Sequence, residues 1–371
     1  MNNNVELPPR GLEGSKPKER SITIDALKGF AIILVVIGHA IQYGSHDVFD
    51  FFGHPLFQII YSFHMPLFIL LSGYVAYFSI GNKSNKSIVT SRINTLLIPF
   101  LCWGVVEFLV GAILMDNSLI KLPKYIVALI IFPDRGLWFI WVLLILYILL
   151  LLIRKFEHKL RVGSYLVIYG VILLIPVNKY FDLYMIKWLM PFFLAGYLIS
   201  KYKSNMQRAL PYIKIASLIV FPVLMLFWEQ KDYIYVSKMT LSSGIASTIA
   251  DYAYRYTVAA AGIALAFTLI SFIKARNINK WLAYVGMYSL DIYAIHLIAA
   301  HYLGDFPTLA SNSYLFNAVY VPAVSIILLA LSILLSKFVI KRNMTLSRLL
   351  LGSKVRLRQE PKENLSHAGT R

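Results

Sequence analysis

Cysteine is nearly absent from this chain of 371 residues, in which Cys102 is the only one. A single cysteine excludes an internal disulfide and any metal or iron–sulfur site built from several cysteines. Charged residues are also scarce, at 15% of the chain, whereas hydrophobic residues make up 58%. Soluble domains carry charge on about a quarter of their residues. The composition therefore excludes an ordinary soluble domain and indicates a polytopic membrane protein.

Ten apolar stretches approach the length of about 20 residues that a membrane-spanning helix needs. They cover residues 22–43, 56–80, 93–115, 137–153, 162–177, 184–200, 210–228, 250–272, 281–302 and 315–340. We predict an all-α fold with about ten transmembrane helices. The transmembrane domain is 21–341, between a polar N-terminal segment, 1–20, and a basic tail, 342–371, which we expect to be disordered or to lie on the membrane surface.

The distribution of positive charge predicts the orientation of the helices. With a cytoplasmic N-terminus, most of the 36 Lys and Arg residues fall in cytoplasmic segments. The predicted outer segments contain only Lys121, Lys124, Arg135, Lys179, Lys231 and Lys238. By the positive-inside rule, both termini are predicted to be cytoplasmic. This asymmetry also accounts for the net charge of +18 without a nucleic-acid partner.

Ionisable side chains inside the predicted helices are candidates for a functional site, because their burial in a membrane is costly. Asp25, Lys28 and His39 lie on one stripe of the first helix at about 100° per residue. His64, His296 and Glu107 fall at depths similar to that of His39, in the outer part of the second, ninth and third helices. Pro66 should kink the second helix just after His64.

Structural interpretations of these residues stay open. His64 or His296 alone would suit a hydrogen bond between helices, and Asp25 would suit a cap that pairs with Lys28. Ser72 would suit helix packing, because no hydrolase elbow surrounds it. Zinc is a further alternative, but no two histidines have a ligand spacing on one helix, so we expect no metal. The chemistry that remains is acid–base, since a neutral imidazole can take a proton from a hydroxyl.

Four motifs carry a resemblance to a known family. They are Asp25-x-x-Lys28-Gly29 with Val35-Val36-Ile37-Gly38-His39; Phe63-His64-Met65-Pro66-Leu67-Phe68 with Leu71-Ser72-Gly73-Tyr74; Leu137-Trp138-Phe139; and Ser289-Leu290-Asp291-Ile292-Tyr293-Ala294-Ile295-His296. In this order and on these helices they resemble the acyltransferase-3 family of bacterial membrane O-acyltransferases, over residues 20 to 340. The branch that looks closest is the fucose 4-O-acetylase-like one.

The resemblance implies a multi-pass protein of the bacterial cytoplasmic membrane. It implies transfer of an acyl group, usually acetyl, from cytoplasmic acyl-CoA to a sugar hydroxyl of an exported or lipid-linked polysaccharide. The partners would be the lipid bilayer, the donor, the glycan and polysaccharide synthesis or export machinery. Acyl-CoA would be a substrate, and we expect no permanently bound cofactor.

The roles of individual residues follow from the resemblance together with their positions. His39 matches the family's essential histidine and would act as general base or as a transient acyl acceptor, with His64 and Asp25 as further catalytic candidates. Acyl-CoA phosphates would bind Lys28, which stands where many members have Arg, and Lys86 and Arg92. Acceptor or supporting candidates are Ser72, Glu107, Trp138, Tyr293 and His296, with Asp134, Glu229 and Arg255 as weaker ones. A pantetheine arm could follow Ile32 and Val35 along the stripe from Lys28 to His39.

Two other classes of function fit the same sequence. One is a glycan or lipid exporter whose intramembrane histidines line a pathway. The other is a non-catalytic component of a polysaccharide synthesis complex.

Overall fold

The computed structural model describes most of the predicted transmembrane domain. The described residues are 21–45, 50–81, 83–115, 118–135, 137–160, 162–176, 180–202, 208–236, 244–273, 276–302 and 313–352. The predicted N-terminal segment 1–20 and residues 353–371 of the predicted tail lie outside them. Within the described ranges the regular structure is helical and contains no strand, which confirms the all-α prediction.

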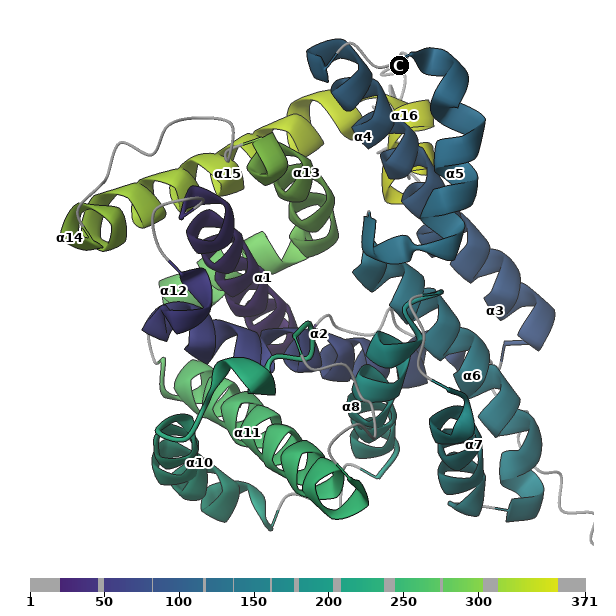
Figure 1. The fold of residues 1–371 in the computed structure, drawn as a ribbon. Helices are drawn as coiled ribbons and strands as arrows, with labels where there is room; N and C mark the ends of the chain where they lie inside the picture. The colour runs from purple at the N-terminus through teal and green to yellow at the C-terminus, as the bar shows by residue number, and fades with distance from the viewer. Residues whose placement is uncertain are drawn as a thin grey trace, which may run out of the picture.

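The main helices are α1 (Ile22–Gly44), α2 (Pro55–Ile80), α3 (Asn85–Arg92), α4 (Ile98–Met115), α5 (Leu122–Ile131), α6 (Trp138–Leu160), α7 (Gly163–Leu174), α8 (Leu183–Lys201), α10 (Leu210–Met225), α11 (Ile245–Phe272), α12 (Arg276–Met287), α13 (Ser289–His301), α14 (Ser313–Leu315), α15 (Val321–Leu335) and α16 (Met344–Leu351). Figure 1 shows α1 beside α12 and α13, with α15 crossing near them, whereas α4, α5 and α16 gather on the other side of the molecule.

Seven helical segments of the described chain are long and apolar enough to cross a membrane. They contain α1, α2, α3 with α4, α6, α8, α11 and α15. The pair α12 and α13 is apolar enough to make an eighth, and α7 and α10 are apolar but shorter. A multi-pass membrane protein is therefore supported, and the count of ten stays a prediction.

The ninth predicted helix, 281–302, is not one straight helix. It is broken into α12 and α13, which meet at 67°. Asp291 in the first turn of α13 accepts a hydrogen bond from Ser336 at 2.5 Å and pairs with Lys341 at 2.6 Å, and the Lys341 ammonium lies 3.8 Å from the centre of the Tyr288 ring. These contacts hold the bend to the end of α15, so Asp291 is satisfied where a straight apolar helix would leave it in lipid.

Two pairs of glycines bring helix backbones into direct contact. A Cβ on Gly29 would lie 1.9 Å from the Leu282 carbonyl oxygen of α12, and one on Gly286 would lie 1.9 Å from the Asp25 carbonyl oxygen of α1. Gly73 of α2 and Gly196 of α8 are matched in the same way, each about 2.0 Å from the partner's backbone. Small residues allow such close packing in membranes, where burial of apolar surface does not drive association.

Prolines change the helices in two ways. The π-helical turns Ile93–Leu97 and Phe316–Tyr320 each end two residues before a proline, Pro99 or Pro322. A proline ring collides with the carbonyl four residues earlier, and a wider turn moves that carbonyl away. In contrast, α2 continues through Pro66 without a break, so the kink predicted after His64 does not interrupt the helix.

The basic tail predicted from residue 342 begins with ordered structure. Residues 344–351 form α16, which packs on α4, and the Trp103 indole N–H donates to the Leu350 carbonyl at 2.8 Å. Asn343 caps this helix by accepting from two backbone N–H groups. This part of the tail is therefore an ordered helix rather than a disordered segment, and its position at the membrane surface stays a prediction.

Candidate active site around His39

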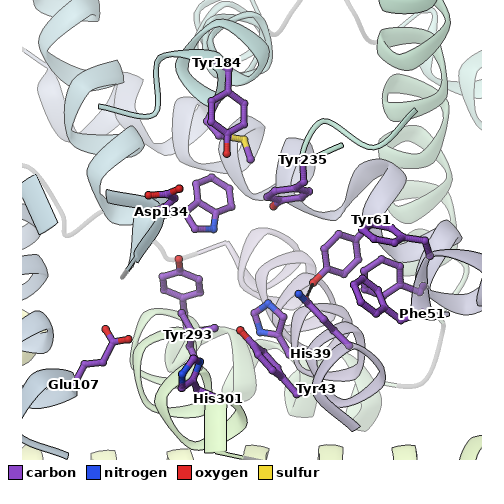
Figure 2. Close-up of a pocket in the computed structure, with 16 residues that line it drawn as sticks. His39, Tyr43, Phe51, Tyr61, Glu107, Asp134, Tyr184, Tyr235, Tyr293 and His301 are labelled. Atoms are coloured by element: carbon purple, nitrogen blue, oxygen red, sulfur yellow. Dashed lines mark hydrogen bonds between the residues drawn. The ribbon is translucent and has the colours of Figure 1, made fainter. Parts of the chain in front are cut away.

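A cavity of about 490 Å³ lies where α1, α2, α4, α6, α8 and α13 meet. Figure 2 shows side chains from these separate elements directed toward the shared space. We call it the His39 cavity; its lining residues are His39, Gln42, Tyr43, Phe51, Phe52, Phe57, Tyr61, Glu107, Asp134, Trp138, Tyr184, Met185, Tyr235, Tyr293, Leu297 and His301. Five residues that the sequence singled out for the site therefore meet here: His39, Glu107, Trp138, Tyr293 and the weaker candidate Asp134.

His39 contacts a second predicted residue, His296, at the wall of this cavity. The His39 Nδ1 and His296 Nε2 atoms are 3.0 Å apart, and the two rings are stacked with their centres 5.1 Å apart. The His296 Nδ1 atom lies 2.5 Å from the carbonyl oxygen of Ile292, one turn earlier on α13. His296 is completely buried, so these two contacts replace the water that it would otherwise bind.

This arrangement selects one tautomer for each neutral ring. A carbonyl oxygen only accepts, so His296 carries its proton on Nδ1 and its Nε2 is an acceptor. His39 must then carry its proton on Nδ1 and donate it to His296. The remaining lone pair of His39 is on Nε2, which makes no hydrogen bond to His296. That atom can accept a proton from a hydroxyl group in the cavity.

His64 lies behind the cavity and does not line it. Its Nδ1 donates to the Ile60 carbonyl at 2.7 Å, one turn earlier on α2, and its side chain is buried. The His64 ring lies beside that of Tyr61, with the centres 4.7 Å apart, and Tyr61 does line the cavity. This geometry places His64 in support of the cavity wall rather than against a ligand.

Two motifs that are far apart in the sequence join at the wall of the cavity. The Phe139 backbone N–H donates to the Tyr293 hydroxyl at 3.3 Å, and the two rings meet edge to face at 5.5 Å. The neighbouring Trp138 ring lies 6.3 Å from Tyr235. The Leu-Trp-Phe stretch at the start of α6 is therefore positioned by α13, and it presents an indole to the cavity.

Arg255 does not line the cavity but holds a loop that does. Its guanidinium donates to the Lys231 carbonyl at 2.6 Å, and its Nε lies 3.9 Å from a carboxylate oxygen of Asp232. Burial raises the pKa of the Asp232 carboxyl. The loop that follows carries Tyr235 into the cavity. The weaker candidate Glu229 points elsewhere and pairs with Lys231 at an exposed position.

Asp25 and Ser72 do not line the His39 cavity. Asp25 is buried about 21 Å from His39 along α1, at 1.5 Å per residue, beside the close packing with α12. The Ser72 hydroxyl donates to the Phe68 carbonyl of its own helix at 2.8 Å. Ser72 therefore matches the packing interpretation left open for it. Asp25 does not cap α1, because the cap position is Ser21 and Asp25 lies within the first turn.

The predicted donor-binding residues are also separate from the cavity. Arg92 donates to the Ser79 hydroxyl at 2.7 Å and lies over the Tyr147 ring at 4.0 Å. Lys28 is half-buried and Lys86 is exposed. Ile32 and Val35, the proposed path between Lys28 and His39, are only 1% and 2% exposed and do not line the cavity. That stripe of α1 is packed protein in this conformation.

Comparison with protein families assigns most of the helical domain to one family. Residues 21–337 match the family model described as "Acyltransferase domain", which is the acyltransferase-3 family. The chain belongs to this family. The motifs that carried the resemblance lie within the matched region.

Two curated relatives of this chain are both called nodulation protein NolL. The one from Sinorhizobium fredii is 30% identical over 62% of this chain and 64% of its own length. The one from Mesorhizobium japonicum is 33% identical over 43% of each chain. The matched part is thus less than two thirds of either relative. No solved structure matches this chain.

Sequence reasoning missed eleven of the sixteen residues that line the cavity. Gln42 and Tyr43 follow His39 by one helical turn, and Tyr61 precedes His64 by nearly one turn, so helical spacing was a usable signal for them. The Tyr61 hydroxyl donates to the Gln42 amide oxygen at 2.9 Å. Tyr184, Tyr235 and His301 carried no comparable signal, because helix ends and a loop bring them in.

Proposed function

We propose that this acyltransferase moves an acyl group, usually acetyl, from acyl-CoA to a hydroxyl group of an extracytoplasmic or lipid-linked glycan. The observation that carries the proposal is the His39 imidazole, whose Nδ1 proton is engaged by His296 and whose Nε2 lone pair is free for base catalysis beside the cavity. Family membership supports acyl transfer, and the cavity supports a polar acceptor with hydroxyl groups.

The proposed reaction uses His39 first as a base and then as an acid. Nε2 takes the proton of the glycan hydroxyl while its oxygen attacks the thioester carbonyl carbon. The tetrahedral intermediate collapses when the carbon–sulfur bond breaks, and His39 returns the proton to the leaving thiolate. The products are an O-acyl ester and CoA. His39 donates through Nδ1 to His296 in both protonation states, so this hydrogen bond persists through the cycle.

The lining of the cavity suits a sugar. Its aromatic rings, Trp138 among them, can lie against the apolar faces of a pyranose, and Glu107 and Asp134 can accept hydrogen bonds from hydroxyls. Ligand sites typically combine apolar and aromatic walls with a few polar groups that set orientation. The acceptor class, a polysaccharide or lipid-linked glycan, rests on this chemistry and on the family resemblance.

The cellular setting is proposed on the charge pattern. Both termini would be cytoplasmic and the His39 cavity would open toward the outside of the cytoplasmic membrane. Acyl-CoA would approach from the cytoplasm, and polysaccharide synthesis or export machinery would supply the acceptor. The product would be an O-acetylated exopolysaccharide or its lipid-linked precursor.

The test is transfer by the purified protein in proteoliposomes given radiolabelled acetyl-CoA and a panel of glycans. We expect wild-type protein to form an alkali-labile glycan ester and His39→Ala to lose about 10²–10⁴-fold in rate with normal folding. His54→Asn is a matched control outside the cavity, where asparagine can still cap α2. More than a tenth of wild-type rate in His39→Ala would contradict base catalysis, and glycan transport without esterification would support the exporter instead.

A further inference from the structure

A second, larger cavity lies at the start of α4, apart from the His39 cavity. It is a groove of about 1310 Å³ between α16 and the continuous segment formed by α3, the π-helical turn and α4. We call it the α3–α16 groove; its lining residues are Lys83, Ser84, Lys86, Ser87, Thr90, Ser91, Asn94, Thr95, Ile98, Met344, Thr345, Arg348, Leu349 and Gly352. It shares no lining residue with the His39 cavity.

The groove has the chemistry of an anion site. Three cations line it, Lys83, Lys86 and Arg348, and none of its described lining residues is acidic. Most of the other lining residues carry a hydroxyl or amide group that can donate to oxygen. Phosphate esters are bound in proteins by this combination of Lys, Arg and neutral donors. The sequence beyond the groove continues with further cations at Lys354, Arg356 and Arg358.

The wall formed by α16 is fixed in place by backbone contacts. Gly352 ends the helix at a φ of 61°, in the left-handed region that favours glycine. A Cβ there would lie 2.5 Å from the Thr95 Cα atom, so the two backbones touch. Together with the Trp103–Leu350 hydrogen bond, this contact fixes the helix that carries Arg348 beside the groove, which Lys86 of α3 also lines. The groove is therefore a preformed feature of the fold.

The groove and the His39 cavity are connected by one helix. Ile98 lines the groove and Glu107 lines the cavity, and both belong to α4. They are separated by about 14 Å along the helix axis at 1.5 Å per residue. A ligand with phosphates at one end and a long flexible arm is therefore the kind of molecule that could be held in the groove while it reaches toward the cavity.

We infer that the α3–α16 groove binds the phosphorylated nucleotide end of acyl-CoA through Lys83, Lys86 and Arg348. This inference rests on the proposed function and names its donor site. The groove lies where the charge pattern predicts the cytoplasmic side, which is where acyl-CoA is available. Its volume exceeds the 300–1,000 Å³ typical of small-molecule pockets, as a bulky nucleotide requires. Arg348 of α16 takes the phosphate-binding role that the sequence predicted for Arg92, because the Arg92 side chain is engaged in packing.

The first measurement is CoA binding to purified protein in a neutral detergent without added lipid. We expect the double variant Lys86→Gln/Arg348→Gln to bind CoA at least tenfold more weakly than wild type, and Lys86→Arg/Arg348→Lys to stay within threefold. Lys155→Gln, an exposed cation on α6, is the matched control and should bind as wild type does. Dephospho-CoA, which lacks one phosphate, should bind wild type more weakly than CoA does, and the double variant should show less of this difference.

The second measurement separates CoA from the other source of phosphate, an anionic lipid headgroup. Wild-type affinity for CoA in the double variant, with loss of binding to phosphatidylglycerol vesicles, would overturn the inference and make the groove a lipid site. Unchanged binding of both ligands would also overturn it. If wild type transfers acetyl groups while the double variant keeps its CoA affinity, only the groove assignment fails. If wild type binds no CoA, the proposed function fails as well.

Discussion

His296 shows how one residue can determine the chemistry of another. It meets Ile292 on one ring nitrogen and His39 on the other, so its own tautomer is set by a carbonyl oxygen. A buried partner of this kind orients the imidazole in the way that a carboxylate does in many catalytic sites. His296 is thus a positioning residue in the proposed mechanism, because it acts through His39 and does not line the cavity.

Replacement of His296 should therefore reduce turnover without changing donor binding. In His296→Ala we expect kcat to fall about 10- to 100-fold. This loss is smaller than the contribution of about 10²–10⁴-fold that a general base makes to the rate. His296→Gln should recover part of the loss, because its amide oxygen can accept the Nδ1 proton of His39. The measurements are kcat, KM for both substrates and the pH–rate profile. An Ala variant whose acid limb and kcat match wild type would show that the contact is only structural.

At the scale of helices, glycine rather than apolar patterning decides which neighbours touch. Gly29 and Gly286 join α1 to α12, and Gly73 and Gly196 join α2 to α8. The Lys-Gly and Ser-Gly-Tyr stretches that carried the family resemblance thus include packing positions as well as chemistry. These contacts fix α1, which carries His39, against the bent pair whose second helix carries His296.

Alanine at these glycines should destabilise the fold, whereas alanine at another helical glycine should not. A methyl group at Gly286 would meet a backbone oxygen, so the helices must separate, and overpacking of this kind costs about 1–3 kcal/mol. The matched control is Gly170→Ala in α7, where no atom lies within 4 Å and alanine gains about 0.5–1 kcal/mol as a better helix former. Thermal unfolding in detergent measures both. Equal midpoints for Gly286→Ala and Gly170→Ala would contradict the close packing.

At the scale of the whole molecule, the distribution of Lys and Arg predicts how the two cavities are oriented relative to the membrane. The His39 cavity and the α3–α16 groove have no lining residue in common, as expected for sites that open on different sides of a membrane. The proposed reaction needs this arrangement, because donor and acceptor come from opposite compartments. The orientation itself remains a prediction of the positive-inside rule.

Reporter fusions can test that orientation. We expect alkaline phosphatase, which folds only outside the cytoplasm, to be active when fused after residue 50 or 125 and inactive after residue 85 or 157. Fusions after residues 178 and 236 test whether the short helices α7 and α10 cross the membrane, and we expect activity at both positions. The reverse pattern at 50 and 85 would reject the two-sided arrangement. Inactivity at either 178 or 236 would reduce the count of ten.

The sequence by itself determined the helical class of the fold and its multi-pass membrane character, and it named His39 as the candidate base. These depend on composition, on runs of apolar residues and on motifs within single helices, and such signals are local. It also placed His39, Glu107, Trp138 and Tyr293 as candidates that the fold brings to one cavity.

Only the tertiary structure decided which candidates line the cavity and which do not. Asp25 is buried away from the cavity, the Ser72 hydroxyl bonds to its own helix, and the Arg92 guanidinium contacts Ser79 and Tyr147. The break at Tyr288 and the contact of α16 with α4 were equally hidden, because each depends on partners far away in the chain. A polar side chain in a membrane must be satisfied by something, and sequence spacing alone does not say whether that partner is a substrate or another helix.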